Sequence, residues 1–213
     1  MTRQFHIITE ADARQIEPGA TVELVKGGHV TPLAQDTLRE RRITVVAAGT
    51  VDAAIPADLV PRADVRRVAI ASDHTGVALR KAIVRHLRGR GLAVDDLGTE
   101  GGTPVDYPDT AAAVAKAVAR GEADAGIVID GAGIGSAIAA NKVRGIRAAM
   151  VTDETIARYS REHNGTNVMT LGSTLVPDQE TAIRLVDTWL GTPMTEARYI
   201  RRLLKVRRLE DAF

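Results

Sequence analysis

The chain has 213 residues, of which 45% are hydrophobic and only 3% aromatic, so its core must be built mainly from Val, Ile, Leu and Ala. Its net charge of +1 at pH 7 gives no electrostatic reason to expect nucleic acid or a membrane as the main partner. The absence of cysteine excludes disulfides, a thiolate nucleophile and a cysteine-ligated metal. We find neither a signal peptide nor an apolar run long enough to cross a bilayer, so the expected location is the cytoplasm.

Residues 1–62 are predicted to form a small N-terminal accessory module of the α+β type. Thr31 and Pro32 suit the N-cap and the first turn of a helix, and the Gly-Gly pair at 27–28 suits a turn. The proline-containing segment 49–64 is the expected linker to the rest of the chain. Strands of this module are expected at 5–9, 20–25 and 43–47.

Residues 66–213 form the second predicted domain, in which apolar strand-like runs alternate with helical patterns. This alternation predicts βαβ units, and therefore an α/β domain with a parallel sheet flanked by helices. Ligands of such sheets bind at the carboxyl ends of the strands, so polar residues that follow a strand are candidate site residues. Strands are expected at 68–71, 93–97, 125–129, 148–151 and 168–171, and helices at 77–88, 111–119, 155–162, 178–190 and 196–208.

The stretch at 127–142, IVIDGAGIGSAIAANK, is the most informative part of the chain. An apolar run ends in Asp130, a glycine-rich turn follows, and Ser136 opens an alanine-rich helical segment. Backbone amides that glycines leave unshielded, together with the positive end of a helix, can hold a phosphate or a developing oxyanion. A plain tight turn between a strand and a helix is the alternative. The stretch is neither a dinucleotide fingerprint nor a P-loop, because its third glycine comes too early and no Gly-Lys-Ser/Thr follows.

Five further motifs occur in an order and at spacings that identify a family. On these motifs the chain resembles, over about residues 66–205, the ribose-5-phosphate isomerase B / galactose-6-phosphate isomerase family of sugar-phosphate isomerases. The resemblance implies a Rossmann-like α/β domain and a homodimer or tetramer whose active sites are shared between protomers. It also implies interconversion of an aldose phosphate and a ketose phosphate without a metal or another cofactor. The motifs are SDHTG at 72–76, VDYPD at 105–109, GIGSAIAANKV at 133–143, GIRAA at 145–149, and SREHN with TNV at 160–168.

The resemblance also implies roles for individual residues. Asp130 occupies the place of the catalytic base, and His163 matches a histidine that opens the sugar ring. The backbone around the glycines matches the anion hole for the enediolate. The residues expected to bind substrate are Asp73, His74, Tyr107, Gly131, Gly133, Gly135, Ser136, Asn164, Arg198 and Arg202.

Two of these residues make sense independently of the resemblance. Arg198 and Arg202 are four positions apart on a predicted helix, which places two guanidinium groups on one face, as a phosphate site requires. The alternative is a solvated basic surface, because Arg201, Arg207 and Arg208 lie on the same helix.

The sequence departs from the family pattern at several site positions. Many members have a cysteine base where Asp130 stands, and another branch has a glutamate base where Ser136 stands. Ala132 replaces a small hydroxyl residue, while Gly165 and Thr174 replace an expected aspartate and arginine. These changes bear on the rate of the reaction, on its substrate, or on both.

Asp130 has two alternative roles. Aldose–ketose isomerisation moves a carbon-bound proton next to a carbonyl, so the base needs reach, a free lone pair and a pKa near the working pH. The reference pKa of an aspartate is about 3.9, and burial would have to raise it. The other role is structural, in which the carboxylate of Asp130 caps the turn or helix that follows.

The N-terminal part carries a second, shorter resemblance. The run GGHVTPLAQDTLRERRI, within 1–62, is similar to a segment attached to enzymes of bacterial microcompartments. Two function hypotheses follow: an active sugar-phosphate isomerase acting on a pentose 5-phosphate or a similar substrate, or a weakly active or non-catalytic sugar-phosphate-binding protein. In the second case residues 1–62 would bind a microcompartment partner or place the protein inside the compartment. A small extension that stabilises a dimer is the plainer alternative.

Overall fold

We analysed the protein as a computed structural model, which describes residues 3–47, 59–61, 64–101, 103–194 and 196–210. The chain divides into two compact units, Met1–Ile55 and Pro56–Phe213. Most of the linker predicted at 49–64 lies outside the described residues. No helix among the described residues is both long enough and apolar enough to span a membrane.

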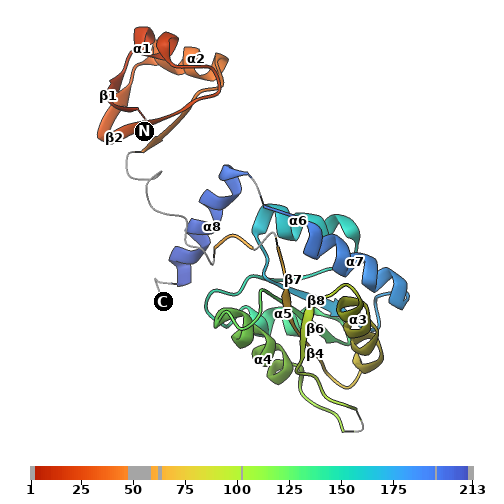
Figure 1. The fold of residues 1–213 in the computed structure, drawn as a ribbon. Coiled ribbons are helices and arrows are strands. Elements are labelled where there is room, and N and C mark those ends of the chain that lie inside the picture. Colours follow the sequence, from red (N-terminus) through yellow and green to blue (C-terminus); the bar gives the residue numbers. More distant parts are fainter. Residues whose placement is uncertain (1–2, 48–58, 62–63, 102, 195, 211–213) are drawn as a thin grey trace. The chain divides into compact units, whose positions relative to one another are not determined.

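The first unit is a three-stranded parallel sheet in the order β1-β2-β3, whose strands alternate with two helices (Figure 1). Its small core is aliphatic apart from the ring of Phe5. Thr9 and Asp12 form a capping box that starts the first helix. The elements are β1 (Gln4–Ile8), α1 (Glu10–Gln15), β2 (Thr21–Val30), α2 (Pro32–Glu40) and β3 (Thr44–Ala47).

This unit differs from the sequence prediction in three respects. Helix α1 was not predicted, and because it connects β1 to β2 the unit is an alternating α/β arrangement rather than the expected α+β one. Strand β2 runs on through the turn expected at 27–28, where an irregularity in its pairing with β1 absorbs the glycines. Thr31 is the N-cap of α2, but its hydroxyl donates to the carbonyl of Ile8 at 3.4 Å instead of capping the helix.

The second unit is a five-stranded sheet in the order β5-β4-β6-β8-β7, and every neighbouring pair is parallel. Strands and helices alternate along the chain, as the sequence predicts. The elements are β4 (Arg67–Ser72), α3 (Val77–Gly89), β5 (Ala93–Asp96), α4 (Tyr107–Ala119), β6 (Ala125–Asp130), α5 (Ile134–Ala140), β7 (Ala148–Met150), α6 (Glu154–Asn164), β8 (Val168–Gly172), α7 (Gln179–Gly191) and α8 (Ala197–Glu210).

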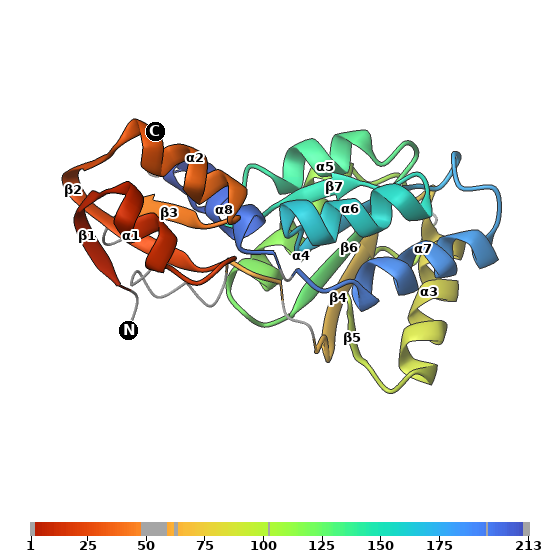
Figure 2. The same ribbon diagram turned by 90° about the horizontal axis from the view of Figure 1, so that it is seen from above.

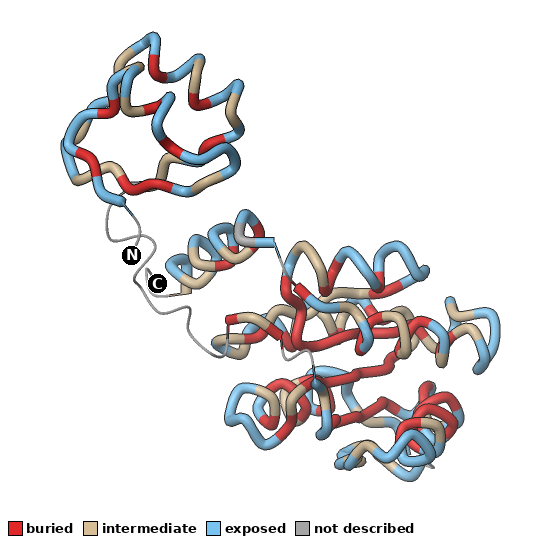
Figure 3. Tube along the Cα trace, turned by 45° about the horizontal axis from the view of Figure 1, so that its top comes forward, coloured by how far each residue is buried: buried red, intermediate tan, exposed pale blue. Residues whose placement is uncertain are grey.

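The alternating residues of β4 show how the sheet separates two hydrophobic cores. Val68 and Ile70 pack with α3, α6 and α7, whereas Ala69 and Ala71 pack with α4 and α5. The layers can be followed in Figure 1 and Figure 2. In Figure 3 the central strands are traced as buried, while the outer turns of the helices are exposed. Both cores are built almost entirely from Ala, Val, Ile and Leu, as the low aromatic content predicts, and Trp189 is the aromatic residue among them.

The strand order creates a switch point between β4 and β6. After β4 the chain adds β5 on one side, and it then crosses to add β6 on the other, so the loops that follow β4 and β6 diverge at the carboxyl edge of the sheet. The amide of Asp73 donates to the carbonyl of Ile129 at 3.0 Å. Asp73 and Asp130 therefore lie at the same edge, as predicted.

Candidate active site

Asp130, the last residue of β6, is 4% exposed and is surrounded by donors from the loop that follows it. Its Oδ1 accepts hydrogen bonds from the amides of Ala132, at 2.9 Å, and of Gly133. Its Oδ2 accepts from the amide and the hydroxyl of Ser136, at 2.8 and 2.6 Å. Four donors thus occupy the four lone-pair positions of the carboxylate.

Glycines allow the loop after Asp130 to fold this tightly. Gly133 has φ +80°, and a Cβ there would lie 2.9 Å from the amide nitrogen of Gly172. A Cβ on Gly135 would lie 2.6 Å from the ring of Tyr107. Helix α5 begins at Ile134, two residues before the predicted start, because Gly133 in its left-handed conformation is the N-cap.

Two threonines hold the glycine loop from the neighbouring strand and its loop. The hydroxyl of Thr170 donates to the carbonyl of Gly133 at 2.7 Å. Thr174 donates to the carbonyl of Gly131 from its hydroxyl at 2.6 Å and from its amide at 3.1 Å. The threonine that stands in place of an expected arginine therefore has a structural role in the loop.

Asp73 lies just beyond β4 and is 7% exposed. Its Oδ1 accepts hydrogen bonds from the amide and the hydroxyl of Thr75, at 2.8 and 2.6 Å. The Thr75 hydroxyl also lies 3.0 Å from that of Ser173, whose amide donates to the carbonyl of Asp130 at 2.7 Å. The loops after β4, β6 and β8 are thereby joined. The neighbouring His74 is exposed, and Tyr107 is 42% exposed at the start of α4.

Arg80 supports this edge from inside the domain, and sequence reasoning missed it. Its side chain is fully buried, donates to the hydroxyl of Ser72 at 3.0 Å and pairs with the carboxylate of Asp96 at 2.9 Å. A Cβ on Gly98 would lie 1.8 Å from the guanidinium, so only glycine leaves room for it. The only sequence signal was a charged residue between the apolar positions of α3.

A second group of candidate residues lies where α6 meets α8. The ring of His163 stacks between those of Tyr159 and Tyr199, with centroid distances of 4.5 and 4.4 Å. Arg198 donates to the hydroxyl of Tyr199 at 2.8 Å and lies over its ring at 4.7 Å, and Arg202 lies over the same ring at 5.6 Å. The arginines predicted to bind phosphate and the histidine predicted to open the ring therefore share one aromatic neighbour.

A buried arginine and a glycine hold the end of α6 that carries His163. Arg161 is fully buried, donates to the carbonyl of Thr166 at 2.8 Å and lies over the ring of Trp189 at 4.7 Å. Burial, and secondly the charge of Arg147, lower the pKa of Arg161 to about 10, so it stays protonated at neutral pH. Gly165, with φ +54°, ends the helix, and a Cβ there would lie 2.7 Å from Leu203 of α8.

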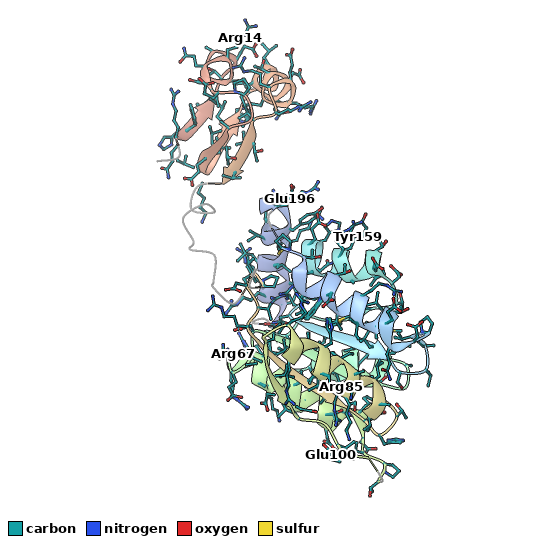
Figure 4. All side chains as sticks on the ribbon, turned by 45° about the vertical axis from the view of Figure 1, so that its right-hand side comes forward. Arg14, Arg67, Arg85, Glu100, Tyr159 and Glu196 are labelled. Atoms are coloured by element: carbon teal, nitrogen blue, oxygen red, sulfur yellow. The ribbon has the colours of Figure 1, made fainter. Side chains whose placement is uncertain are left out.

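The two groups of candidate residues lie at opposite edges of the sheet. Asp73, Asp130 and their loops follow the carboxyl ends of strands, whereas His163 and Asn164 end the helix that leads into the start of β8. In Figure 4, Glu100, in the loop after β5, and Glu196, just before α8, mark opposite ends of the domain. One chain therefore does not bring its Asp130 and His163 together. The described residues include no group of three or more His, Cys, Asp or Glu side chains arranged to hold a metal ion.

Comparison with known proteins gives consistent matches over the second unit. The model of the Ribose/Galactose Isomerase family matches residues 68–206. Ribose-5-phosphate isomerase B of Escherichia coli (strain K12) is 43% identical over 146 residues, which is 68% of this chain and 97% of that protein. The structure of ribose-5-phosphate isomerase B from Clostridium thermocellum has a TM-score of 0.67 at 46% identity, and it covers 68% of this chain and 98% of its own.

A further solved structure contains a bound sugar phosphate. Ribose-5-phosphate isomerase B from Mycoplasma genitalium, determined with bound ribulose-5-phosphate, has a TM-score of 0.66 at 40% identity and covers 69% of this chain and 97% of its own. The first unit of the present chain lies outside the residues that the family model matches.

Proposed function

The chain belongs to the ribose/galactose isomerase family, and from this premise we propose that it interconverts an aldose phosphate and a ketose phosphate, with a pentose 5-phosphate as the first candidate. The observation that carries the proposal is the glycine loop beside Asp73 at the switch point of the sheet. It lies within the residues that match the family, and one solved relative binds ribulose-5-phosphate.

We propose that the working site is composed of residues from two copies of the chain in a homodimer or tetramer. The opposite positions of Asp130 and His163 in one chain support this arrangement, because a second copy is needed to bring both to one substrate. Ile134 and Ile138, which are 53% and 58% exposed on α5 beside the glycine loop, also support it, because a partner would cover them.

The phosphate group of the substrate is proposed to bind at Arg198 and Arg202. Both guanidinium groups lie against Tyr199, so their positions are restricted before a ligand arrives, and that reduces the entropy lost on binding. His163, stacked on the same ring, is proposed to transfer the proton that opens the cyclic sugar. Asn164, exposed at the end of α6, is proposed to bind substrate hydroxyl groups.

The contacts of Asp130 favour a capping role over a role as base. A general base needs a lone pair directed at the proton that it removes, and the four hydrogen bonds of this carboxylate occupy the available positions. In the proposed site Asp130 shapes the loop, while the amides of Ile134 and Gly135 have no acceptor among the described residues. Those two amides are proposed to donate to the enediolate oxygen.

The experiment that tests the function is proton–deuterium exchange at the carbon next to the carbonyl. It is followed by NMR over aldose and ketose phosphates of four to six carbons, with the unphosphorylated sugars as controls. Exchange with at least one phosphate, accompanied by formation of its isomer, is the expected result. Binding of sugar phosphates without any exchange would favour the alternative of a sugar-phosphate-binding protein. The hydrogen bonds that the carboxylate of Asp130 already accepts support that alternative.

Residues 1–62 are proposed to act as an accessory module that is not needed for the chemistry, because the match to the family begins at residue 68. Binding to a bacterial microcompartment partner remains the more specific alternative. Fusion of 1–62 to a fluorescent protein, expressed together with microcompartment shell proteins, tests it: localisation to the compartments would support encapsulation, and a diffuse signal would contradict it.

A further inference from the structure

The two buried carboxylates that follow the neighbouring central strands β4 and β6 differ in how fully they are hydrogen-bonded. Asp130 accepts four hydrogen bonds, two on each oxygen. Asp73 accepts two, and both reach Oδ1 from Thr75. Oδ2 of Asp73 accepts no hydrogen bond from the part of the chain that the structure describes. Of the two, Asp73 is therefore the carboxylate that retains an oxygen able to accept a proton.

We propose that Asp73, and not Asp130, is the base that moves the carbon-bound proton in this protein. The inference rests on the proposed isomerase function and assigns its central step to a residue for which the sequence indicated only substrate binding. The amide of Asp73 donates to the carbonyl of Ile129, the residue before Asp130, so Asp73 lies beside the end of the strand that leads into the glycine loop. In this proposal, a substrate held against that loop presents its carbon-bound proton to Oδ2.

Thr75 keeps the free oxygen of Asp73 in one orientation. Its amide and hydroxyl bind the same oxygen, Oδ1, and its hydroxyl is positioned in turn by Ser173 at 3.0 Å. These bonds restrict the rotation of the carboxylate and leave Oδ2 unoccupied. A base must be held in position in this way to react efficiently. Thr75 and Ser173 are positioning residues in this arrangement.

The other titratable side chains near this edge are less suitable. His74 is exposed, so water would compete for its ring nitrogens. Tyr107 is 42% exposed at the start of α4, so water would compete for its hydroxyl as well. Asp73 is 7% exposed, which limits access of water while one oxygen stays available.

The chemical step balances without a further reactant. Oδ2 of Asp73 takes the proton from the carbon next to the carbonyl, and the electron pair of that C–H bond forms the C=C bond of the enediolate. The π pair of the carbonyl moves to its oxygen, where backbone amides stabilise the negative charge. The proton of the neighbouring hydroxyl moves to the oxygen that was the carbonyl, which leaves the negative charge on the second oxygen. That oxygen forms the new carbonyl, and the electron pair of the C=C bond takes the proton back from the carboxyl of Asp73 at the former carbonyl carbon.

The direct test compares deuterium exchange by the full-length protein and two variants. Asp73→Asn keeps the shape of the side chain but cannot accept the proton, so exchange should fall at least a hundredfold while binding of the sugar phosphate changes by less than about fivefold. The matched control is Asp95→Asn, which neutralises an exposed carboxylate on β5 and should leave exchange unchanged. Exchange by Asp73→Asn within threefold of the parent would overturn the assignment.

A chemical rescue separates a base from a residue that only binds substrate. Asp73→Ala leaves space for a small carboxylate, so added formate should restore exchange at least tenfold in this variant and leave the parent unaffected. Lack of rescue in a folded Asp73→Ala variant would overturn the role of Asp73 as base. If the parent itself exchanges no proton with any sugar phosphate, the proposed isomerase function fails, an outcome distinct from an active parent with an active Asp73→Asn variant.

Discussion

The imidazole ring of His163 lies against the phenol ring of Tyr199, with centroids 4.4 Å apart and planes inclined by 29°. Tyr199 is 6% exposed and also accepts a hydrogen bond from Arg198. Arg202 lies over the same ring. One buried tyrosine thus connects the candidate ring-opening residue with both candidate phosphate ligands.

Two substitutions at Tyr199 should separate its ring from its hydroxyl. Tyr199→Phe keeps the stacking on His163 and loses the hydrogen bond from Arg198, a loss of about 0.5–1.5 kcal/mol that should weaken phosphate binding about two- to tenfold. Tyr199→Leu also removes the aromatic face and should weaken binding further. Calorimetric titration with ribose 5-phosphate measures both, and equal affinities for the two variants would contradict a role of the ring.

Replacement of either candidate phosphate ligand should weaken binding of phosphorylated sugars only. Arg198→Ala and Arg202→Ala each remove a charge-assisted hydrogen bond worth about 1.5–3 kcal/mol, so dissociation constants should rise about ten- to a hundredfold. Arg201→Ala is the matched control, because Arg201 is exposed on the same helix and makes no contact with the Tyr199 ring. If all three variants bind alike, α8 is only a basic surface.

The capping role of Asp130 predicts a large effect on stability. Asp130→Ala leaves buried amides of the glycine loop without their acceptor and should lower the free energy of unfolding of the second unit by about 3 kcal/mol. Fluorescence of Trp189, the single tryptophan of the chain and fully buried in this unit, follows the transition in urea. Asp153→Ala, which removes an exposed cap at α6, should cost clearly less.

The acid sensitivity of the second unit should depend on the cap of α7. Hydrogen bonds from the amide and then the hydroxyl of Thr181 lower the pKa of Asp178 below its ordinary value of 3.8. The ionised cap therefore stabilises the fold above about pH 4, and this contribution is lost as the pH falls through the lowered pKa. Asp178→Asn should show a shallower loss of stability below pH 4 by Trp189 fluorescence. An unchanged acid limb would contradict the assignment.

The composite site predicts an oligomer in solution. Light scattering at micromolar concentration should give at least twice the mass of one chain, and activity per chain should fall on dilution below the dissociation constant of the assembly. Ile138→Glu, which places a charge on the exposed apolar face of α5, should weaken association. A monomeric parent with full activity would contradict the composite site.

Periodicity and strand–helix alternation were sufficient to predict the second unit, but local chemistry decided where its helices begin. Helix α4 begins at Tyr107 rather than at the predicted residue 111, because Pro108 fits the first turn; Asp106 is the N-cap by position, but its side chain makes no capping hydrogen bond. Helix α1 was missed although Thr9 and Asp12 form a capping box, because it has only six residues.

The hydrogen bonds of the candidate site were beyond what the sequence could predict. The motif identified Asp130 and the glycines, but whether the carboxylate faces the loop or the substrate depends on backbone geometry set by Gly133. The burial of Arg80 likewise depends on Gly98, which lies in the loop after β5. Contacts between residues far apart in the chain leave no local pattern to read.

Helix α6 ends at the edge of the sheet opposite Asp73, and this separation of His163 from Asp73 has a genetic consequence. Suppose that each site takes Asp73 from one chain and His163 from another. A chain with a substituted Asp73 then damages one site, and its normal His163 still serves the other. An Asp73→Asn chain paired with a His163→Ala chain would contain one doubly damaged site and one intact site. Two alleles that are each inactive alone would then complement each other when expressed in the same cell.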